Sequence, residues 1–284
     1  MGKRWFGVMG DPVMHSVSPA MMNAAFTAQN LDAVYLAFHV PAESLTEAVN
    51  GLRALGAAGV NVTIPHKQAV LEVTDSTSKE AELAGAANTL WFLEDGSIHA
   101  HNTDIEGWWG SVSPVLPMHW ERAAVLGAGG ASRAVLTALS LYKPDCKVDI
   151  VVRDVGKAEA IARQFADRLT IDIHDWQARG EVISACDLAV NTTSLGMWPH
   201  EDGSPVQDAD CFKTGQVVQD LVYAPLETHF LRLARSGGAT PVDGLGMLVG
   251  QGAASFRLWT GLAAPQAVMR QAAEQALAQR RANA

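Results

Sequence analysis

Cysteine is scarce in this chain, and long hydrophobic runs are lacking. The 284 residues include three cysteines, Cys146, Cys186 and Cys211, at spacings unlike those of zinc sites. An odd, widely spaced set argues against a disulfide framework and favours three buried thiols in a reduced, cytoplasmic setting. No stretch approaches the roughly 20 apolar residues of a membrane span, and the first ten residues lack the apolar core of a signal peptide. We therefore expect no membrane partner.

Positive charge is also in short supply. Lysine and arginine total 21 against 30 acidic residues, which gives a formal net charge of −9. Because there is no long basic run, a nucleic-acid surface is not expected. The nine histidines have no ligand spacing, so no metal is expected either. Hydrophobic residues make up 48% of the chain, as in a packed globular protein, and its length of 284 residues favours two domains.

Short apolar runs alternate with helical segments in the first hundred residues, a pattern typical of an α/β fold. We expect strands over 5–9, 34–40 and 59–64, helices over 19–29 and 44–55, and a hairpin of 88–93 with 97–101. Ser18 is expected to cap the first helix, with Pro19 at its first position. Asp95-Gly96 is a dipeptide that favours the tight turn of a hairpin.

A second series of elements begins near Arg122. We expect strands over 123–126, 148–152, 188–191 and 216–220, and helices over 131–141 and 157–168. This spacing predicts a doubly wound parallel sheet. The expected architecture is an N-terminal α/β substrate domain, 1–112, and a Rossmann-like nucleotide domain, 113–246, with a mobile cleft between them. Two C-terminal helices within 247–284 complete the first domain, and Ser113 to Pro117 form the expected connection.

A glycine-rich turn follows the strand over 123–126 and precedes a helix. It reads Gly127-Ala128-Gly129-Gly130-Ala131, followed by Ser132. The first glycine permits a tight turn, the second lets the backbone approach a pyrophosphate, and the helix N-terminus offers free N–H groups. Ser132 fills the position that requires a small residue. The motif predicts a dinucleotide site, against the alternative of a glycine turn that binds nothing.

The next strand ends at Val152-Arg153-Asp154, where the adenosine ribose is expected. An acidic residue there would bind the 2′-hydroxyl of NAD, whereas arginine can pair with the 2′-phosphate of NADP. The chain has both, and Lys157 lies one turn further on. Because Arg153 and Lys157 together can neutralise a dianion, we favour NADP and keep NAD as the alternative.

Polar side chains cluster at four places in the first half of the chain. Ser16 and Ser18 place two hydroxyls near a helix start, and Asn61 and Thr63 alternate with apolar residues at a strand end. Asn88 with Thr89, and Asn102 through Asp104, add amides and a carboxylate. A ring with several hydroxyls and one carboxylate requires a set of short, rigid donors and acceptors like this one.

These residues resemble the shikimate dehydrogenase family over nearly the whole chain. The matching motifs are SVSP at Ser16, NVTIPHK at Asn61, GAANT at Gly85, NTD at Asn102, GAGGASRA at Gly127, NTTSLGM at Asn191, DLVYAPLET at Asp220 and DGLGMLVGQGA at Asp243. Members reduce 3-dehydroshikimate to shikimate, reversibly, with NADPH. The family often has Asn-Arg-Thr where this chain has Val152-Arg153-Asp154, which leaves the choice of cofactor open.

The resemblance implies a role for each matching residue. Lys67 and Asp104 are the catalytic pair. The implied substrate ligands are Ser16 and Ser18 for the carboxylate, Asn61, Thr63, Asn88, Asp104 and Gln251 for ring hydroxyls, and Tyr223 to close the pocket. The implied cofactor ligands are Gly127, Ala128, Gly129, Gly130 and Ala131 for the pyrophosphate, Val152, Arg153, Asp154 and Lys157 for the ribose end, and Thr193, Leu221, Gly244 and Met247 along the path to the nicotinamide.

Each catalytic residue also has a simpler interpretation. Lys67 alone would be an ordinary surface lysine, and Asp104 could merely cap a helix at Ile105. His15, His66 and His101 are expected to flank the site or lie on the surface rather than act as catalytic acids. Alternative functions are an NAD-preferring quinate/shikimate dehydrogenase, an amino-shikimate dehydrogenase, or a non-catalytic sensor of NADPH or a metabolite. A monomer or a homodimer is expected.

Overall fold

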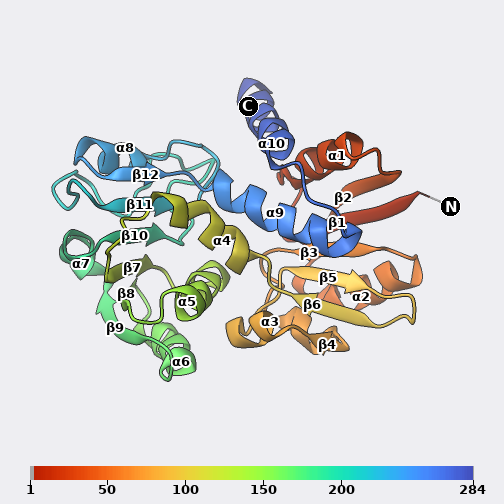
Figure 1. Cartoon of the computed structure of the whole chain (residues 1–284), viewed down its shortest axis with the longest axis horizontal. Coiled ribbons are helices and arrows are strands. Elements are labelled where there is room, and N and C mark those ends of the chain that lie inside the picture. Colours follow the sequence, from red (N-terminus) through yellow and green to blue (C-terminus); the bar gives the residue numbers. More distant parts are fainter. Residues whose placement is uncertain (1–2, 284) are drawn as a thin grey trace. The chain divides into compact units, whose positions relative to one another are not determined.

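The computed structural model describes residues 3–283 and divides into two compact units (Figure 1). The first unit is the chain up to Gly107 together with the part from Val249 onward, and the second unit is Trp108–Leu248. Both boundaries lie inside helices, α4 (Asp104–Val112) and α9 (Leu245–Thr260). The expected connection at Ser113 to Pro117 is therefore wrong by several residues, because the chain passes between the units as helix and Ser113–Val115 is a short 3-10 helix, η3, inside the second unit.

The first unit has a mixed six-stranded sheet in the order β2-β1-β3-β5-β6-β4. Its other elements, in chain order, are β1 (Arg4–Gly10), α1 (Ser18–Ala28), β2 (Ala33–His39), η1 (Ala42–Ser44), α2 (Leu45–Ala54), β3 (Gly59–Val62), η2 (Ala69–Val73), β4 (Ser76–Thr77), α3 (Lys79–Ala84), β5 (Thr89–Phe92), β6 (Ile98–His101) and α10 (Gln266–Asn283). β1 pairs parallel to β2 and β3, whereas β5 pairs antiparallel to β3 and β6.

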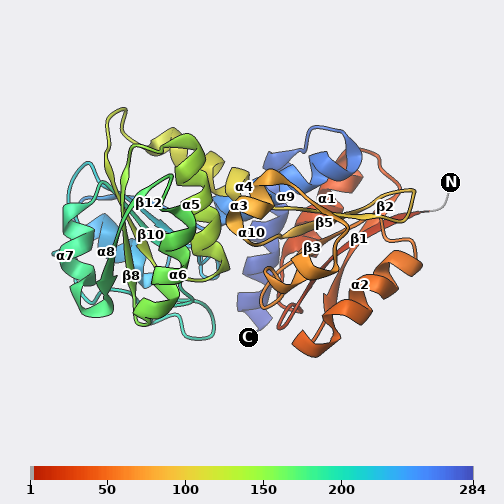
Figure 2. The ribbon, with the colours of Figure 1, turned by 90° about the horizontal axis from the view of Figure 1, so that it is seen from below.

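The two faces of this sheet carry different cores, because side chains alternate along each strand. On one face α2 packs its buried Leu45, Val49 and Leu52 against the sheet. On the other face Phe6 of β1 lies 5.1 Å from Phe26 and 5.0 Å from Trp259, measured between ring centroids. Figure 2 shows α1 and α2 on opposite faces of the sheet. The face that carries Phe6 also carries Asn61 of β3, which is described below.

The second unit has a parallel six-stranded sheet in the order β12-β11-β10-β7-β8-β9. Its elements are β7 (Arg122–Leu126), α5 (Gly130–Tyr142), β8 (Lys147–Val152), α6 (Val155–Phe165), β9 (Thr170–Asp175), η4 (Trp176–Ala178), α7 (Arg179–Ala185), β10 (Leu188–Asn191), β11 (Val217–Asp220), α8 (His229–Ser236) and β12 (Thr240–Val242). Figure 2 shows α5 and α6 on one face of this sheet and α7 and α8 on the other. The predicted doubly wound parallel sheet is confirmed.

Several local expectations need correction. The first helix begins at Ser18, and Val17 occupies the N-cap position without a side-chain hydrogen bond, so Ser18 is not the cap. The helix expected from Lys157 begins at Val155, because the Asp154 side chain caps it. Short elements were missed, namely β4, α3, β9, α7, α8 and β12. Within residues 3–283, no helix combines the length and apolarity that crossing a bilayer requires.

Two glycines allow α4 and α9 to approach closely at the edge of the first unit. A Cβ added to Gly107 would lie 2.4 Å from the backbone nitrogen of Gln251, and one added to Gly250 would lie 2.9 Å from the Cα of Gly107. Real Cβ atoms do not approach backbone atoms so closely. The contact therefore fixes Gln251 relative to the start of α4, where Asp104 lies.

Replacing Gly107 by alanine should separate these helices and destabilise the protein. We expect Gly107→Ala to lower the free energy of unfolding by about 1–3 kcal/mol, the usual range for overpacking. Gly110 lies in the same helix with nothing within 4 Å of an added Cβ. Gly110→Ala is the matched control and should be neutral or stabilising by about 0.5–1 kcal/mol. Urea unfolding of both variants measures the difference, and equal midpoints would refute the close-packing argument.

Candidate active site

Lys67 and Asp104 form the centre of the polar site in the first unit. The Lys67 Nζ lies 2.6 Å from the Asp104 Oδ2, and the two side chains are 18% and 6% exposed. Lys67 follows β3 in a turn whose buried His66 ring bonds the Val40 carbonyl oxygen at 2.7 Å, and Ala87 N donates to Lys67 O at 2.7 Å. Asp104 is the first residue of α4. The geometry thus joins the two predicted catalytic residues directly.

The second oxygen of Asp104 also has a donor. Asn88 Nδ2 donates to Asp104 Oδ1 at 2.8 Å and lies 3.4 Å from Gln251 Oε1. Thr103 N donates to Asn88 Oδ1 at 2.7 Å, which fixes which end of the Asn88 amide faces Asp104. Asn88 and Gln251 are 2% and 8% exposed. Four predicted site residues, from a strand end, a turn and two helices, are therefore connected by hydrogen bonds.

The residues predicted to bind the substrate carboxylate lie at the start of α1: Ser16 is in the turn before the helix, and Ser18 is its first residue. Ser16 Oγ accepts from Ser18 N at 3.2 Å, so its own hydroxyl proton remains available for another acceptor. Arg280, in the last turn of α10, donates to the backbone oxygens of both His15 and Ser16. Sequence reasoning missed this contact, because Arg280 follows Ser16 by 264 residues.

Two further predicted substrate ligands lie on or beside β3. Thr63 follows the strand, and its backbone N donates to Met9 O at 2.9 Å. Asn61 lies within β3 and is 6% exposed. Its amide contacts Tyr35, Asn88, Thr89 and Ser255. Thr63 is half-buried and lies between β3 and the turn that contains Lys67. Asn61, in contrast, is surrounded by protein groups.

The predicted pyrophosphate turn has the expected geometry. Gly127 follows β7 with φ of 112°, and a Cβ there would lie 2.7 Å from Thr192 Oγ1, so only glycine fits. At Gly129, the N-cap of α5, an added Cβ would meet nothing within 4 Å, which leaves the approach to the helix N-terminus open. Buried Ser132 closes the turn by donating to Gly129 O at 2.7 Å. The turn fits a bound phosphate.

At the predicted ribose end, the acidic residue is engaged by its own helix. Asp154 Oδ1 accepts from Lys157 N at 3.3 Å, and Oδ2 lies 3.9 Å from Lys157 Nζ. Val152 is the buried last residue of β8, whereas Arg153 and Lys157 are exposed. The two cations are thus accessible to a phosphate, while Asp154 caps α6.

The residues predicted along the cofactor path lie in the loops after β10, β11 and β12 and in the first turn of α9. Thr193 N and Oγ1 both donate to Asn191 Oδ1, at 3.0 and 2.7 Å. A Cβ on Gly244 would lie 2.5 Å from Leu221 O, so this position requires glycine. Met247 is 9% exposed at the start of α9, and Tyr223 is half-buried in the loop after β11.

Comparison with known proteins shows to which family the chain belongs. A model of the shikimate dehydrogenase substrate binding domain matches residues 8–90, and one of the shikimate 5'-dehydrogenase C-terminal domain matches residues 244–274. The shikimate dehydrogenase (NADP(+)) of Methanopyrus kandleri is 44% identical over 272 residues, 94% of this chain and 93% of that protein. The chain belongs to the shikimate dehydrogenase family.

Solved structures support this membership. A Thermus thermophilus shikimate 5-dehydrogenase in complex with NADP(H) and shikimate has a TM-score of 0.86 and 37% identity, covering 96% of this chain and 99% of that one. The quinate dehydrogenase of Corynebacterium glutamicum in complex with NAD has a TM-score of 0.88 and 32% identity, covering 96% and 99%. Fold similarity therefore extends to family members with different substrates and cofactors.

This shikimate dehydrogenase family member contains a buried carboxyl group that the sequence did not single out. Asp220, the last residue of β11, is fully buried and accepts from Asn191 Nδ2, Val222 N and Thr228 Oγ1 at 2.9, 3.0 and 2.7 Å. Burial raises the pKa of Asp220 to about 7, although the three donors pull it down. Asp220 thereby fixes Asn191, which holds Thr193, and the segment that contains Leu221 and Tyr223.

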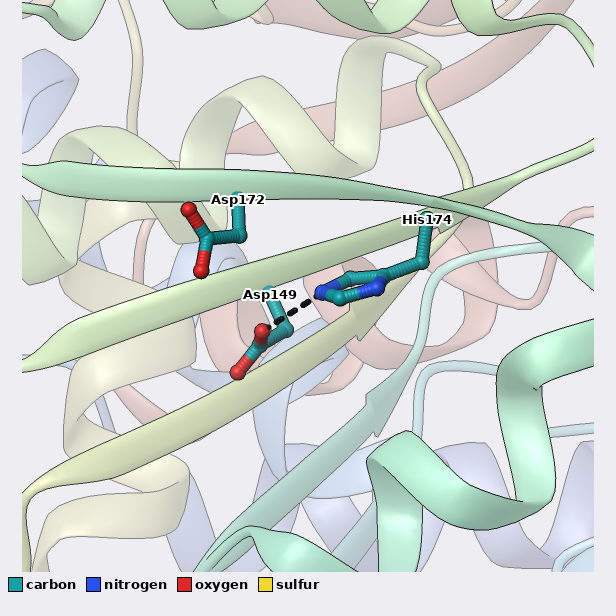
Figure 3. A group of neighbouring side chains, drawn as sticks. All are labelled: Asp149, Asp172 and His174. Carbon is teal, nitrogen blue, oxygen red and sulfur yellow. Dashed lines mark hydrogen bonds and ion pairs between the residues drawn. The ribbon is translucent and has the colours of Figure 1, made fainter.

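A group of two acids and a histidine lies on β8 and β9. Asp149, Asp172 and His174 have side-chain oxygen or nitrogen atoms within 4.8 Å of one another (Figure 3). Arg122 binds both oxygens of Asp149, at 2.5 and 3.0 Å, and His174 Nε2 lies 2.7 Å from Oδ1. Lys147 pairs with Asp172 at 2.6 Å. Burial alone would raise the pKa of Asp149, but these partners leave it lowered. Ion pairing accounts for the cluster without a metal.

Substitution of Asp220 should change how stability depends on pH. The folded pKa of about 7 lies above the ordinary aspartate pKa of about 3.9, so folding binds a proton between these pH values and stability is lost as pH rises from about 4 to about 7. An asparagine keeps a neutral group and can donate to Thr228 Oγ1. We therefore expect Asp220→Asn to gain stability relative to the parent protein between pH 4 and 8, by at most about 4 kcal/mol.

Urea unfolding at several pH values measures this gain. Asp208→Asn, at an exposed position of the same unit, is the control and should leave the profile unchanged. Parallel profiles for the parent protein and Asp220→Asn would show that Asp220 titrates normally.

Proposed function

We propose that this chain catalyses the reversible reduction of 3-dehydroshikimate to shikimate with NADPH. The observation that carries the proposal is the 2.6 Å contact between Lys67 Nζ and Asp104 Oδ2 in a largely buried polar site. Membership in the shikimate dehydrogenase family supports the substrate, since relatives at 44% and 42% identity are shikimate dehydrogenases (NADP(+)).

Lys67 handles the proton of the reacting hydroxyl. An ammonium group has three N–H donors; one is directed at Asp104, and two remain for the substrate oxygen. During reduction Lys67 donates a proton to the oxygen as negative charge develops on it, and in the reverse direction the neutral amine removes that proton. Asp104 orients the amine and accepts from a neighbouring ring hydroxyl. The partial exposure of Lys67 allows exchange of the proton with solvent.

The remaining polar residues orient the substrate. Ser16 and Ser18 bind its carboxylate through their hydroxyls, and the backbone N–H groups at the start of α1 add to the attraction. Thr63, Asn88 and Gln251 bind ring hydroxyls. Tyr223 closes the pocket on the carboxylate side. Rigid donors of this kind hold the reacting carbon in one position, which lowers the entropic part of the barrier.

Residues of the second unit fit a nicotinamide dinucleotide. Gly127 to Ala131 hold the pyrophosphate, and the open space at Gly129 supports this assignment. Arg153 and Lys157 bind the 2′-phosphate of NADP, while Val152 borders the ribose and Asp154 is occupied as a helix cap. Thr193, Leu221, Gly244 and Met247 line the path to the nicotinamide. When bound, NADPH supplies the hydride.

We also propose the cytoplasm as the location and a monomer or homodimer as the active state. The three cysteines are free and buried, as predicted. Burial raises the pKa of the Cys146 and Cys186 thiols to about 12 and that of Cys211 to about 11, so none is poised to form a disulfide. A measured mass above that of two chains would exclude this assembly.

The proposed activity is tested by crossing two acids with two cofactors. Oxidation of shikimate or quinate, followed by nicotinamide absorbance, should give the highest kcat/KM for shikimate with NADP. A higher kcat/KM for quinate with NAD would replace the proposal by a quinate dehydrogenase. Binding of NADPH and shikimate without turnover would favour a sensor.

Loss of the Lys67 amine should remove proton transfer while leaving most substrate contacts intact. We expect Lys67→Ala to lower kcat by roughly 10² to 10⁴, the usual contribution of a general acid or base, with a much smaller change in KM for the acid. Lys79→Ala, at an exposed position of the same unit, is the control and should retain parental kinetics. Near-parental kcat in Lys67→Ala would remove Lys67 from the mechanism.

A further inference from the structure

Five buried polar side chains are hydrogen-bonded around Asn88, which bonds Asp104, and we call them the polar cluster. Their exposed fractions are 6% or less, and they come from β2, β3, β5, the turn before α4, and α9; they are Tyr35, Asn61, Thr89, Thr103 and Ser255. Burying such groups costs free energy unless each finds a hydrogen-bond partner. Tyr35, Thr103 and Ser255 have no role in the mechanism described above.

Asn61 is held by protein groups at both ends of its amide. Tyr35 Oη donates to Asn61 Oδ1 at 2.7 Å. Asn61 Nδ2 has Asn88 O, Thr89 Oγ1 and Ser255 Oγ within 3.1 Å. An amide nitrogen has two protons, so these three acceptors exceed its supply. Asn61 therefore has no N–H left for a ring hydroxyl, contrary to the role that the family resemblance implied.

The hydroxyls of the polar cluster converge on the Asn88 side chain. Thr89 Oγ1 and Thr103 Oγ1 each lie 3.0 Å from Asn88 Oδ1, and Ser255 Oγ lies 3.0 and 3.1 Å from these two hydroxyls. Ser255 donates its own proton to Gln251 O at 3.0 Å and accepts from Asn61 Nδ2, so Thr89 and Thr103 can give their protons to Asn88 Oδ1. The Asn88 oxygen is thus surrounded by donors, and its nitrogen must face Asp104.

We propose that Tyr35, Asn61 and Ser255 are positioning residues for the Lys67–Asp104 pair and act by fixing the orientation and donor direction of the Asn88 amide. They act through other residues and touch no reacting atom. A hydrogen-bonded path leads from Tyr35 through Asn61, Thr89 and Asn88 to Asp104 Oδ1, while Lys67 binds the opposite oxygen. The kinetic part of this inference rests on the proposed function.

Tyr35 is the first donor of the hydrogen-bonded path to Asp104. Burial raises the pKa of its phenol well above the usual value, so Tyr35 remains a protonated donor at every working pH. In Tyr35→Phe, Asn61 Oδ1 loses this donor. The Asn61 amide can then turn its oxygen towards Thr89, whose proton would be drawn away from Asn88 Oδ1. The hold on Asn88 weakens without any change in the residues that contact the substrate.

A double-mutant cycle tests whether Tyr35 acts through the pair. We expect Tyr35→Phe to lower kcat about 10-fold in the parent protein, with KM for NADP(H) unchanged. In the Lys67→Ala background the same change should lower kcat less than 2-fold, because the amine that Asn88 and Asp104 orient for proton transfer is gone. Ser255→Ala should behave in the same way. An equal loss in both backgrounds, or no loss in either, would overturn the proposal.

Ser78→Ala is the control for loss of a half-buried, hydrogen-bonded hydroxyl. Ser78 caps α3 and bonds His101 in the same unit, outside the polar cluster. It should lower the melting temperature and leave kcat and its pH profile at parental values. If Ser78→Ala lowers kcat as much as Ser255→Ala does, the effect is one of general stability and the positioning role fails.

A measurement that needs no turnover separates this inference from the proposed function. The side-chain amide signals of Asn61 and Asn88 in ¹H–¹⁵N spectra report their hydrogen bonds directly. Tyr35→Phe should shift both signals and speed exchange of the Asn88 amide protons with solvent, whereas Ser78→Ala should shift neither. An unchanged Asn88 signal would overturn the positioning role even if the protein oxidises shikimate. Inactivity of the parent protein would overturn the proposed function alone.

Discussion

The carboxylate of Asp104 imposes the main constraint on the first unit. The Asp104 side chain is 6% exposed, and a buried charge is tolerated only where donors replace the lost water. Lys67 supplies one donor and Asn88 the other. Supplying the second donor in turn requires a fixed amide, and fixing that amide requires Thr103 and the hydroxyls around it. The need to satisfy one buried charge thus determines the placement of Lys67, Asn88 and Thr103, which are separated in the sequence.

Close approaches between backbone segments make this placement possible. Gly107 lets α9 come close enough for Gln251 to reach Asn88. Gly59 makes room for Trp259, whose indole nitrogen donates to Leu90 O at 3.0 Å and so fixes α9 over the sheet. In the second unit Gly244 does the same for the loop that contains Leu221. At each of these positions the absence of a side chain allows a neighbouring residue to lie in direct contact with the backbone.

Much of this arrangement could be predicted from local sequence, and the failures have physical reasons. Strands such as β1 and β8 were predicted within one residue, because their apolar runs are bounded by polar residues. β12 has three residues and contains Pro241, so its pairing with β11 depends on tertiary contact. β9 alternates as Thr-Ile-Asp-Ile-His-Asp, a strand signal that was present and overlooked. Arg280 is beyond such reasoning, because its partners are 265 and 264 residues away.

The hydrogen bonds of a motif residue, unlike its type, show whether its polar atoms are already bonded to other protein groups. Asn61 and Asn88 look alike in sequence, yet Asn61 gives its amide to neighbouring side chains, whereas Asn88 directs its nitrogen at Asp104. Asp154 presents the same problem at the ribose end, where an acid indicates NAD and Arg153 indicates NADP. Its Oδ1 accepts the Lys157 N–H at the start of α6. A carboxylate already bonded to its own helix is a weaker ribose ligand, and its negative charge lies beside Lys157. Local capping of α6 by Asp154 therefore adds to the preference for NADP that Arg153 and Lys157 indicate.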